Sequence, residues 1–183
     1  MNFRKMSVLV GVLIIGCIVS PALAQEPVQE RPVLEPGVHE ATGLAMYVEP
    51  EDADMGIFIL TVMDRYFYTG NVQLGGAFMF AGTVGADDDA GVNMFMGNAT
   101  YNFNLENSPQ YVPYAYASLG YASVEFEGDS EGGMLYGAGA GIRYFLNRST
   151  AIILDASHQI IEMEGESMGT TMVLGGLSFF LMP

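Results

Sequence analysis

Two histidines are the side chains best suited to proton transfer in this chain, and one of them adjoins a hydroxyl. His158 follows Ser157, whereas His39 stands where a polar tail meets the first apolar segment. A serine nucleophile needs a base within hydrogen-bond reach. Adjacent residues of a β-strand point to opposite faces, so we expect His158 to face outward and away from Ser157. The pattern predicts no catalytic residues, and the chain is not expected to be an enzyme.

Metal binding is the second kind of chemistry that the residue types allow. Met94 and Met96 could offer thioether sulfur to Cu(I), but facing lipid or filling gaps between side chains is the stronger interpretation. Asp87, Asp88 and Asp89 are weak candidates for binding Ca²⁺ or Mg²⁺ through carboxylate oxygens. They lack the spaced ligands of an EF-hand loop, so we predict neither a dedicated metal site nor a cofactor.

The composition narrows the class of protein. The 183 residues are 50% hydrophobic and 15% charged, which excludes a disordered polar chain. Six basic residues against 21 acidic ones give a net charge of −15, which excludes the basic patch that nucleic-acid binders need. The single cysteine excludes an internal disulfide and a metal site of several thiolates.

The N-terminal residues have the pattern of an export signal. Arg4 and Lys5 precede a short apolar run that ends in the small-residue sequence Ala-Leu-Ala. Residues 1–24 are therefore predicted to be a secretory signal peptide, cleaved after Ala24. A rival interpretation is a lipoprotein signal that leaves a lipidated Cys17 as the new N-terminus. Residues 25–37 hold three prolines and are predicted to form an extended tail, followed by one folded domain over residues 38–183.

Eight segments of this domain have the composition of β-strands. They are rich in Tyr, Phe, Val, Ile, Met and Gly and are bounded by turn-forming residues. Strands that cross a bilayer at a tilt need about 9–11 residues, whereas those of soluble domains average about 5–6. The predicted segments have the longer length and lie at residues 38–48, 56–68, 71–83, 91–104, 110–126, 133–146, 150–162 and 168–182.

Side chains alternate between an apolar face and a small or polar face. Tyr136 and Ile142 share one face of the sixth segment, whereas Arg143 lies on the other with three glycines. An apolar exterior around a polar interior is the pattern of a transmembrane barrel, whereas a soluble lipocalin-like barrel would reverse it. Asp155 lies on the polar face of the seventh segment. Two buried charges need partners, so we expect Arg143 and Asp155 to pair inside the barrel.

The links between segments differ in charge according to their order. Links two, four and six hold one acid and one arginine. Links one, three, five and seven hold 14 of the 21 acids, namely Glu49, Glu51, Asp52, Asp54, Asp87, Asp88, Asp89, Glu125, Glu127, Asp129, Glu131, Glu162, Glu164 and Glu166. In an up-and-down meander the odd links share one rim. The chain is thus predicted to be an all-β, eight-stranded antiparallel up-and-down transmembrane β-barrel. We assign its polyanionic rim to the cell exterior, since periplasmic turns are short.

Three stretches carry a family resemblance. They are residues 66–75 (YFYTGNVQLG), 112–121 (VPYAYASLGY) and 137–146 (GAGAGIRYFL) with the AIILD that follows. They resemble the small bacterial outer-membrane β-barrel proteins related to the OmpA transmembrane domain and to OmpX. The resemblance implies an outer-membrane barrel over roughly residues 38–183 but hardly specifies activity. The His-x-Ser pattern of lipid A deacylases is absent, because Ile160 follows His158 by two residues.

Two functions of different classes follow from this expectation. The first is a monomeric structural or surface-interaction protein, whose anionic rim would meet lipopolysaccharide through divalent cations, or a host or other surface ligand. The second is a narrow conduit for small or hydrophobic solutes, because small residues would leave space inside the barrel. Those residues are Ser118, Gly120, Gly137, Gly139 and Gly141.

Overall fold

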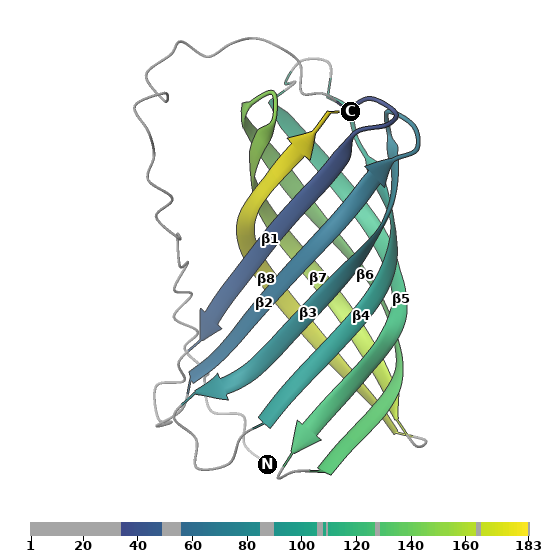
Figure 1. Cartoon of the computed structure of the whole chain (residues 1–183), viewed down its shortest axis with the longest axis vertical. Coiled ribbons are helices and arrows are strands. Elements are labelled where there is room, and N and C mark those ends of the chain that lie inside the picture. Colours follow the sequence, from purple (N-terminus) through teal and green to yellow (C-terminus); the bar gives the residue numbers. More distant parts are fainter. Residues whose placement is uncertain are drawn as a thin grey trace.

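The computed structural model describes residues 34–48, 56–84, 90–105, 108, 110–126, 129–163 and 166–182. Eight antiparallel strands in this part of the chain close into a barrel in sequence order (Figure 1). No helix among the described residues is long and apolar enough to cross a membrane. The strands are β1 His39–Val48, β2 Gly56–Phe67, β3 Val72–Val84, β4 Ala90–Asn102, β5 Tyr111–Phe126, β6 Asp129–Asn147, β7 Thr150–Met163 and β8 Glu166–Leu181.

The eight predicted segments correspond to the eight strands, and the predicted fold class is confirmed. The largest difference is at β6, which begins at Asp129 instead of residue 133. Gly132, which lies just before the predicted segment, and Gly133 pair with Ser123 and Ala122 of β5. A Cβ on Gly132 would meet the Tyr121 ring, so this glycine is a strand residue that makes room for an aromatic neighbour.

Strand pairing is uneven around the barrel. β5 pairs with β6 along its whole length, from Tyr111 to Phe126. β1 pairs with β8 only over His39–Ala45, opposite Leu181 to Gly175. β8 nevertheless continues to Glu166, where it pairs with Met163 of β7. The pairing of β1 with β8, which closes the barrel, is therefore the shortest strand pairing. It lies toward the even-link end, the end at which links two, four and six join the strands.

The two faces of the barrel differ as the alternation predicts. On β2, the outward residues Leu60 and Val62 are 46% and 54% exposed. The residue that follows each of them, Thr61 and Met63, points inward and is buried. The same alternation of buried and exposed residues runs along β7. The exterior of the described strands is thus the more apolar surface, and most of their polar side chains away from the rims lie inside.

A belt of aromatic side chains surrounds the end at which β2, β4 and β6 finish. The outward residues of this belt include Tyr66, Tyr101, Phe103, Tyr111, Tyr144 and Phe179. Ring centroids are 5.1 Å apart for Tyr101 and Phe103, and 5.0 Å apart for Tyr111 and Tyr144. Aromatic belts of this kind lie at the membrane–water interface of transmembrane barrels.

Candidate functional site

A buried ion pair lies inside the barrel near the aromatic belt. Glu40 of β1 and Arg143 of β6 are both fully buried. Arg143 donates from Nε to Glu40 Oε1 at 2.7 Å and from Nη2 to Glu40 Oε2 at 2.8 Å. Two parallel hydrogen bonds between a guanidinium and a carboxylate form the most directional ion pair available to side chains.

Three neutral side chains bind this ion pair and form with it what we call the Glu40 cluster: Glu40, Gln73, Asn102, Arg143 and Ser178. Thr42 Oγ1 also donates to Glu40 Oε1, at 3.3 Å. Gln73 Nε2 and Ser178 Oγ each donate to the Glu40 carboxylate at 2.6 Å. Arg143 Nη1 donates to Asn102 Oδ1, and Asn102 Nδ2 donates to Gln73 Oε1 at 3.1 Å. The cluster therefore joins β1, β3, β4, β6 and β8 across the interior.

Arg65 of β2 is a second buried cation beside the cluster. Its Nη1 lies 3.7 Å from Glu40 Oε2, and its Nη2 donates to Met63 Sδ at 2.9 Å. The guanidinium carbon stands 5.3 Å and 5.8 Å from the ring centroids of Tyr114 and Tyr116. Nε and Nη1 find no hydrogen-bond acceptor among the described residues, so Arg65 is held chiefly by charge and aromatic faces.

The ion pair predicted between Arg143 and Asp155 is not formed, although both side chains are buried inside the barrel. Asp155 instead accepts hydrogen bonds from the hydroxyls of Tyr114 at 2.6 Å and Tyr116 at 2.9 Å. Tyr114 bridges the two charges, because its ring centroid also lies 4.2 Å from the Arg143 guanidinium carbon. Strand register explains the error, since Asp155 is level with Gly141 of β6 and not with Arg143.

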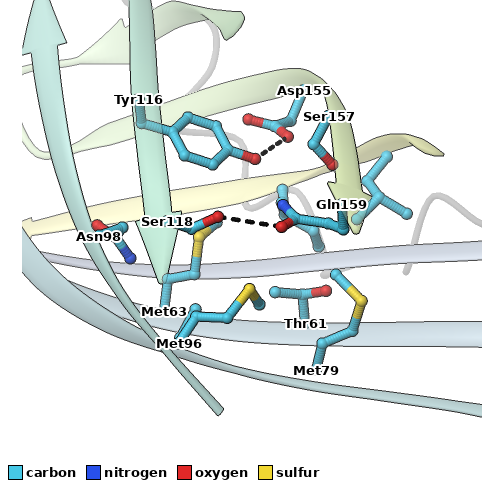
Figure 2. A pocket seen from close by; sticks show the side chains of 13 residues that line it. Thr61, Met63, Met79, Met96, Asn98, Tyr116, Ser118, Asp155, Ser157 and Gln159 are labelled. Atoms are coloured by element: carbon cyan, nitrogen blue, oxygen red, sulfur yellow. Dashed lines mark hydrogen bonds between the residues drawn. The ribbon is translucent and has the colours of Figure 1, made fainter. Parts of the chain in front are cut away.

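Asp155 and Tyr116 also line a cavity inside the barrel (Figure 2). The cavity volume is about 20 Å³, which is room for about one water. Ser118 donates to Gln159 Oε1 at 3.0 Å at its edge, while Thr61 Oγ1 and Asn98 Oδ1 lack partners among the described residues. Its lining is Leu44, Thr61, Met63, Ala77, Met79, Met96, Asn98, Tyr116, Ser118, Asp155, Ser157, Gln159 and Leu174.

The interior glycines do not leave the gap that a conduit was expected to use. A Cβ on Gly139 would lie 2.5 Å from the Tyr116 ring, and one on Gly141 would lie 2.5 Å from the Tyr114 ring. A Cβ on Gly137 would meet Gln159 Oε1. Gly120 lies against the backbone of β4, and Ser118 is itself buried. Side chains from neighbouring strands therefore occupy the space that these small residues vacate.

The remaining candidate residues lie apart from one another. His158 faces outward, with its Nδ1 2.9 Å from Thr171 Oγ1, whereas Ser157 is buried inside. Met94 and Met96 are both buried in the interior. Ala24, Cys17, Asp87, Asp88 and Asp89 lie outside the described residues. Within the described ranges, no three His, Cys, Asp or Glu side chains are grouped to hold a metal ion.

The described part of the odd-link rim carries exposed carboxylates at Glu125, Glu131, Glu162 and Glu166. Tyr136 donates a hydrogen bond to Glu162 Oε1 at 2.9 Å. The other acids predicted for this rim belong to side chains that the structure does not describe. The closed up-and-down order of the strands brings the strand ends that flank the four odd links to the same end of the barrel.

No protein-family model and no curated protein matches this sequence. Solved structures are similar in fold. The outer membrane protein OprG from Pseudomonas aeruginosa is similar with a TM-score of 0.58 and 10% identity, over 81% of this chain and 98% of that chain. Neisserial surface protein A gives 0.56 and 15%, over 78% and 94%. Ail from Yersinia pestis, in a bilayer nanodisc, gives 0.53 and 17%, over 80% and 100%.

Identities this low establish the fold and leave the activity open. The similar structures are small bacterial outer-membrane barrels, and the match to this chain covers each of them almost completely. The chain therefore has the eight-stranded fold of the small outer-membrane β-barrels, as its resemblance to OmpA and OmpX predicted.

Proposed function

We propose that this protein is a monomeric structural barrel of the bacterial outer membrane that presents a polyanionic rim for surface interactions. The observation that carries the proposal is the apolar outer wall of the described strands, and the acids of the four odd links in the sequence support the rim. Export would use residues 1–24 as a signal peptide, leaving residues 25–37 as a tail and 38–183 as the barrel domain. No catalytic role is proposed, because His158 and Ser157 lie on opposite faces.

The apolar wall supports placement in a bilayer. Large hydrophobic side chains such as Leu60, Phe95, Leu119 and Leu154 are about half exposed on the outward face of different strands. A soluble monomer rarely exposes a contiguous apolar patch of more than a few hundred Å². A closed barrel satisfies its own backbone hydrogen bonds, which is the condition for a β-structure to cross hydrocarbon.

The acidic end supports a role in surface contact. The four odd links contain 14 acids and no lysine or arginine. Charge of one sign on one rim raises the local concentration of counter-ions, and carboxylate oxygens suit Mg²⁺ and Ca²⁺. Divalent cations on this rim would bridge to lipopolysaccharide phosphates, and a cationic host or other surface ligand would meet the same charge.

The first test is location and heat-modified mobility. The folded barrel is expected in the outer-membrane fraction, and its unboiled form is expected to migrate differently from its boiled form on a denaturing gel. Recovery in the soluble periplasm without a mobility shift would overturn the proposal and favour a lipocalin-like binder.

The second test addresses the rim. Replacing Asp87, Asp88 and Asp89 together with Asn is expected to weaken Mg²⁺-dependent binding to lipopolysaccharide vesicles. Glu106→Gln, which removes an acid from an even link, is the control and is expected to leave this binding unchanged. Equal binding by the triple variant and the control would count against the rim as the binding surface.

The conduit is the weaker proposal. The Glu40 cluster, Tyr114 and Tyr116 lie across the interior, and the cavity beyond them admits about one water. We therefore expect no steady conductance in planar bilayers. A stable open channel in the purified barrel would restore the conduit as the leading function.

A further inference from the structure

One acidic side chain faces outward from the wall instead of toward a rim or the interior. Asp64 of β2 is 70% exposed and is flanked on the same face by Val62 and Tyr66. The other outward acids of the described strands, such as Glu125 and Glu162, lie near the odd-link rim. Asp64 precedes Tyr66 of the aromatic belt by two residues, on the side toward the middle of the wall. In the proposed bilayer placement it therefore borders the hydrocarbon layer.

The surface beside Asp64 is made of small residues. Its strand partners are Ala41 of β1 and Gly76 of β3. A Cβ on Gly43 would meet nothing within 4 Å, and one on Gly76 would meet only the Met96 carbonyl oxygen at 3.7 Å. No large side chain from these positions covers the carboxylate, so it remains open to whatever surrounds the barrel.

The only charged or titratable partner of Asp64 among the described residues is His39. His39 Nδ1 lies 3.5 Å from Asp64 Oδ1, and the two side chains are 49% and 70% exposed. The His39 ring packs edge-on against Tyr66, with centroids 5.1 Å apart. An exposed pair at this distance contributes little. Asp64 Oδ2 has neither an ion-pair nor a hydrogen-bond partner in the described part of the chain.

Within the described part of the chain, no lysine or arginine forms an ion pair with Asp64. The only lysine of the chain is Lys5. Arg65 and Arg143 are buried in the interior, and Arg148 lies in an even link. An ionisable residue on a lipid-facing surface is costly unless a partner compensates it. Among the described residues no lysine or arginine compensates Asp64, so its carboxylate is open to a cation of the surrounding membrane.

We propose that Asp64, with His39 and Tyr66, binds the primary ammonium headgroup of a zwitterionic phospholipid in the leaflet at the even-link end. An ammonium group donates up to three hydrogen bonds and suits a carboxylate with a free oxygen. The Tyr66 ring adds an aromatic face for the cation. The small residues leave room for the lipid to approach the wall. This inference rests on the proposed placement in a bilayer.

The test compares two lipids that differ only in the headgroup nitrogen. Folded protein in mixed micelles with equal phosphatidylethanolamine and phosphatidylcholine would be analysed by native mass spectrometry for retained lipid. Wild type is expected to retain phosphatidylethanolamine about tenfold over phosphatidylcholine, the lower end of what one charge-assisted hydrogen bond implies. Asp64→Asn is expected to bring this ratio close to one, whereas Glu125→Gln, with the same loss of charge at the other rim, is expected to preserve it.

The outcomes separate this inference from the proposed function. Equal retention of the two lipids by folded wild type would overturn the inference, and so would a preference that survives in Asp64→Asn. If Asp64→Asn does not fold, the wild-type ratio alone decides. Failure of wild type to insert into either lipid, measured first by the heat-dependent gel shift, would instead refute the placement in a bilayer.

Discussion

Replacing Arg143 with Met removes four hydrogen bonds from the barrel interior, two of them to the Glu40 carboxylate. Removing one partner of a buried ion pair costs about 3–5 kcal/mol, because the other charge stays buried without compensation. Glu40 would keep its hydrogen bonds from Gln73 and Ser178 and would keep Arg65 at 3.7 Å. We therefore expect Arg143→Met to lower the free energy of unfolding by about 3 kcal/mol, the lower end of that range.

A pair of double-mutant cycles identifies the partner. Combining Arg143→Met with Glu40→Leu removes both charges, so the double variant is expected to lose about 2 kcal/mol less than the sum of the single variants. Combining Arg143→Met with Asp155→Asn is expected to be additive to within about 1 kcal/mol, since Tyr114 links the two residues only indirectly.

The assay follows the fraction of folded barrel in urea by unboiled gel mobility, because the chain has no tryptophan for fluorescence. Urea midpoints and slopes for the five variants and wild type give the coupling energies. A larger coupling for Asp155 than for Glu40 would refute the pairing described above. Additive losses in both cycles would show that neither carboxylate is the energetic partner of Arg143.

Three further predictions concern the interior. Gly139→Ala is expected to lower the free energy of unfolding in urea by about 1–3 kcal/mol, because the added Cβ would lie 2.5 Å from the Tyr116 ring. Gly43→Ala is the control and should leave this free energy nearly unchanged, because nothing lies within 4 Å of the added Cβ. Equal losses of stability in the two variants would contradict the packing described for Gly139. Thr61→Val is expected to be neutral or stabilising, because the buried Thr61 hydroxyl has no partner among the described residues. Ser118→Ala should lower the free energy of unfolding by about 1 kcal/mol, because it removes the hydrogen bond to Gln159. A larger loss of stability in Thr61→Val than in Ser118→Ala would reveal a buried water bound to Thr61. Planar-bilayer recordings of wild type should show a closed barrel, and steady single-channel currents would refute it.

The sequence predicted the strands well because their information is local. Alternation with a period of two, together with turn-forming residues, located all eight strands. The same alternation correctly placed Arg143 and Asp155 in the barrel interior. The partner of Arg143 is not local. Glu40 lies 103 residues away, and only the register of the closed barrel makes the two side chains level. The alternation of side chains along β1 would have placed Glu40 on the inward face. Alternation does not say at which level along the barrel axis a residue lies, so it could not pair Glu40 with Arg143.

The interior glycines show a second limit of local patterns. Gly139 and Gly141 lack side chains, which suggests empty space when the strand is considered alone. The space is filled by Tyr116 and Tyr114, which project from β5 against β6. Whether a small residue opens a gap or accepts a neighbour depends on what the adjacent strand presents at the same level. The expectation of a conduit came from considering the composition of single strands.

The short pairing of β1 with β8 has a consequence for the order of assembly. Glu40 and Ser178, which hydrogen-bond across it, are 138 residues apart. Closing a loop of that length costs about 4 kcal/mol in chain entropy, which hairpins between neighbouring strands avoid. The two terminal strands should therefore meet last, after a curved open sheet has formed. Until then, both sheet edges expose unpaired backbone groups that can join another chain. The nascent barrel is accordingly most prone to aggregate just before Glu40 reaches Ser178, and a chaperone that shields those edges would act in that interval.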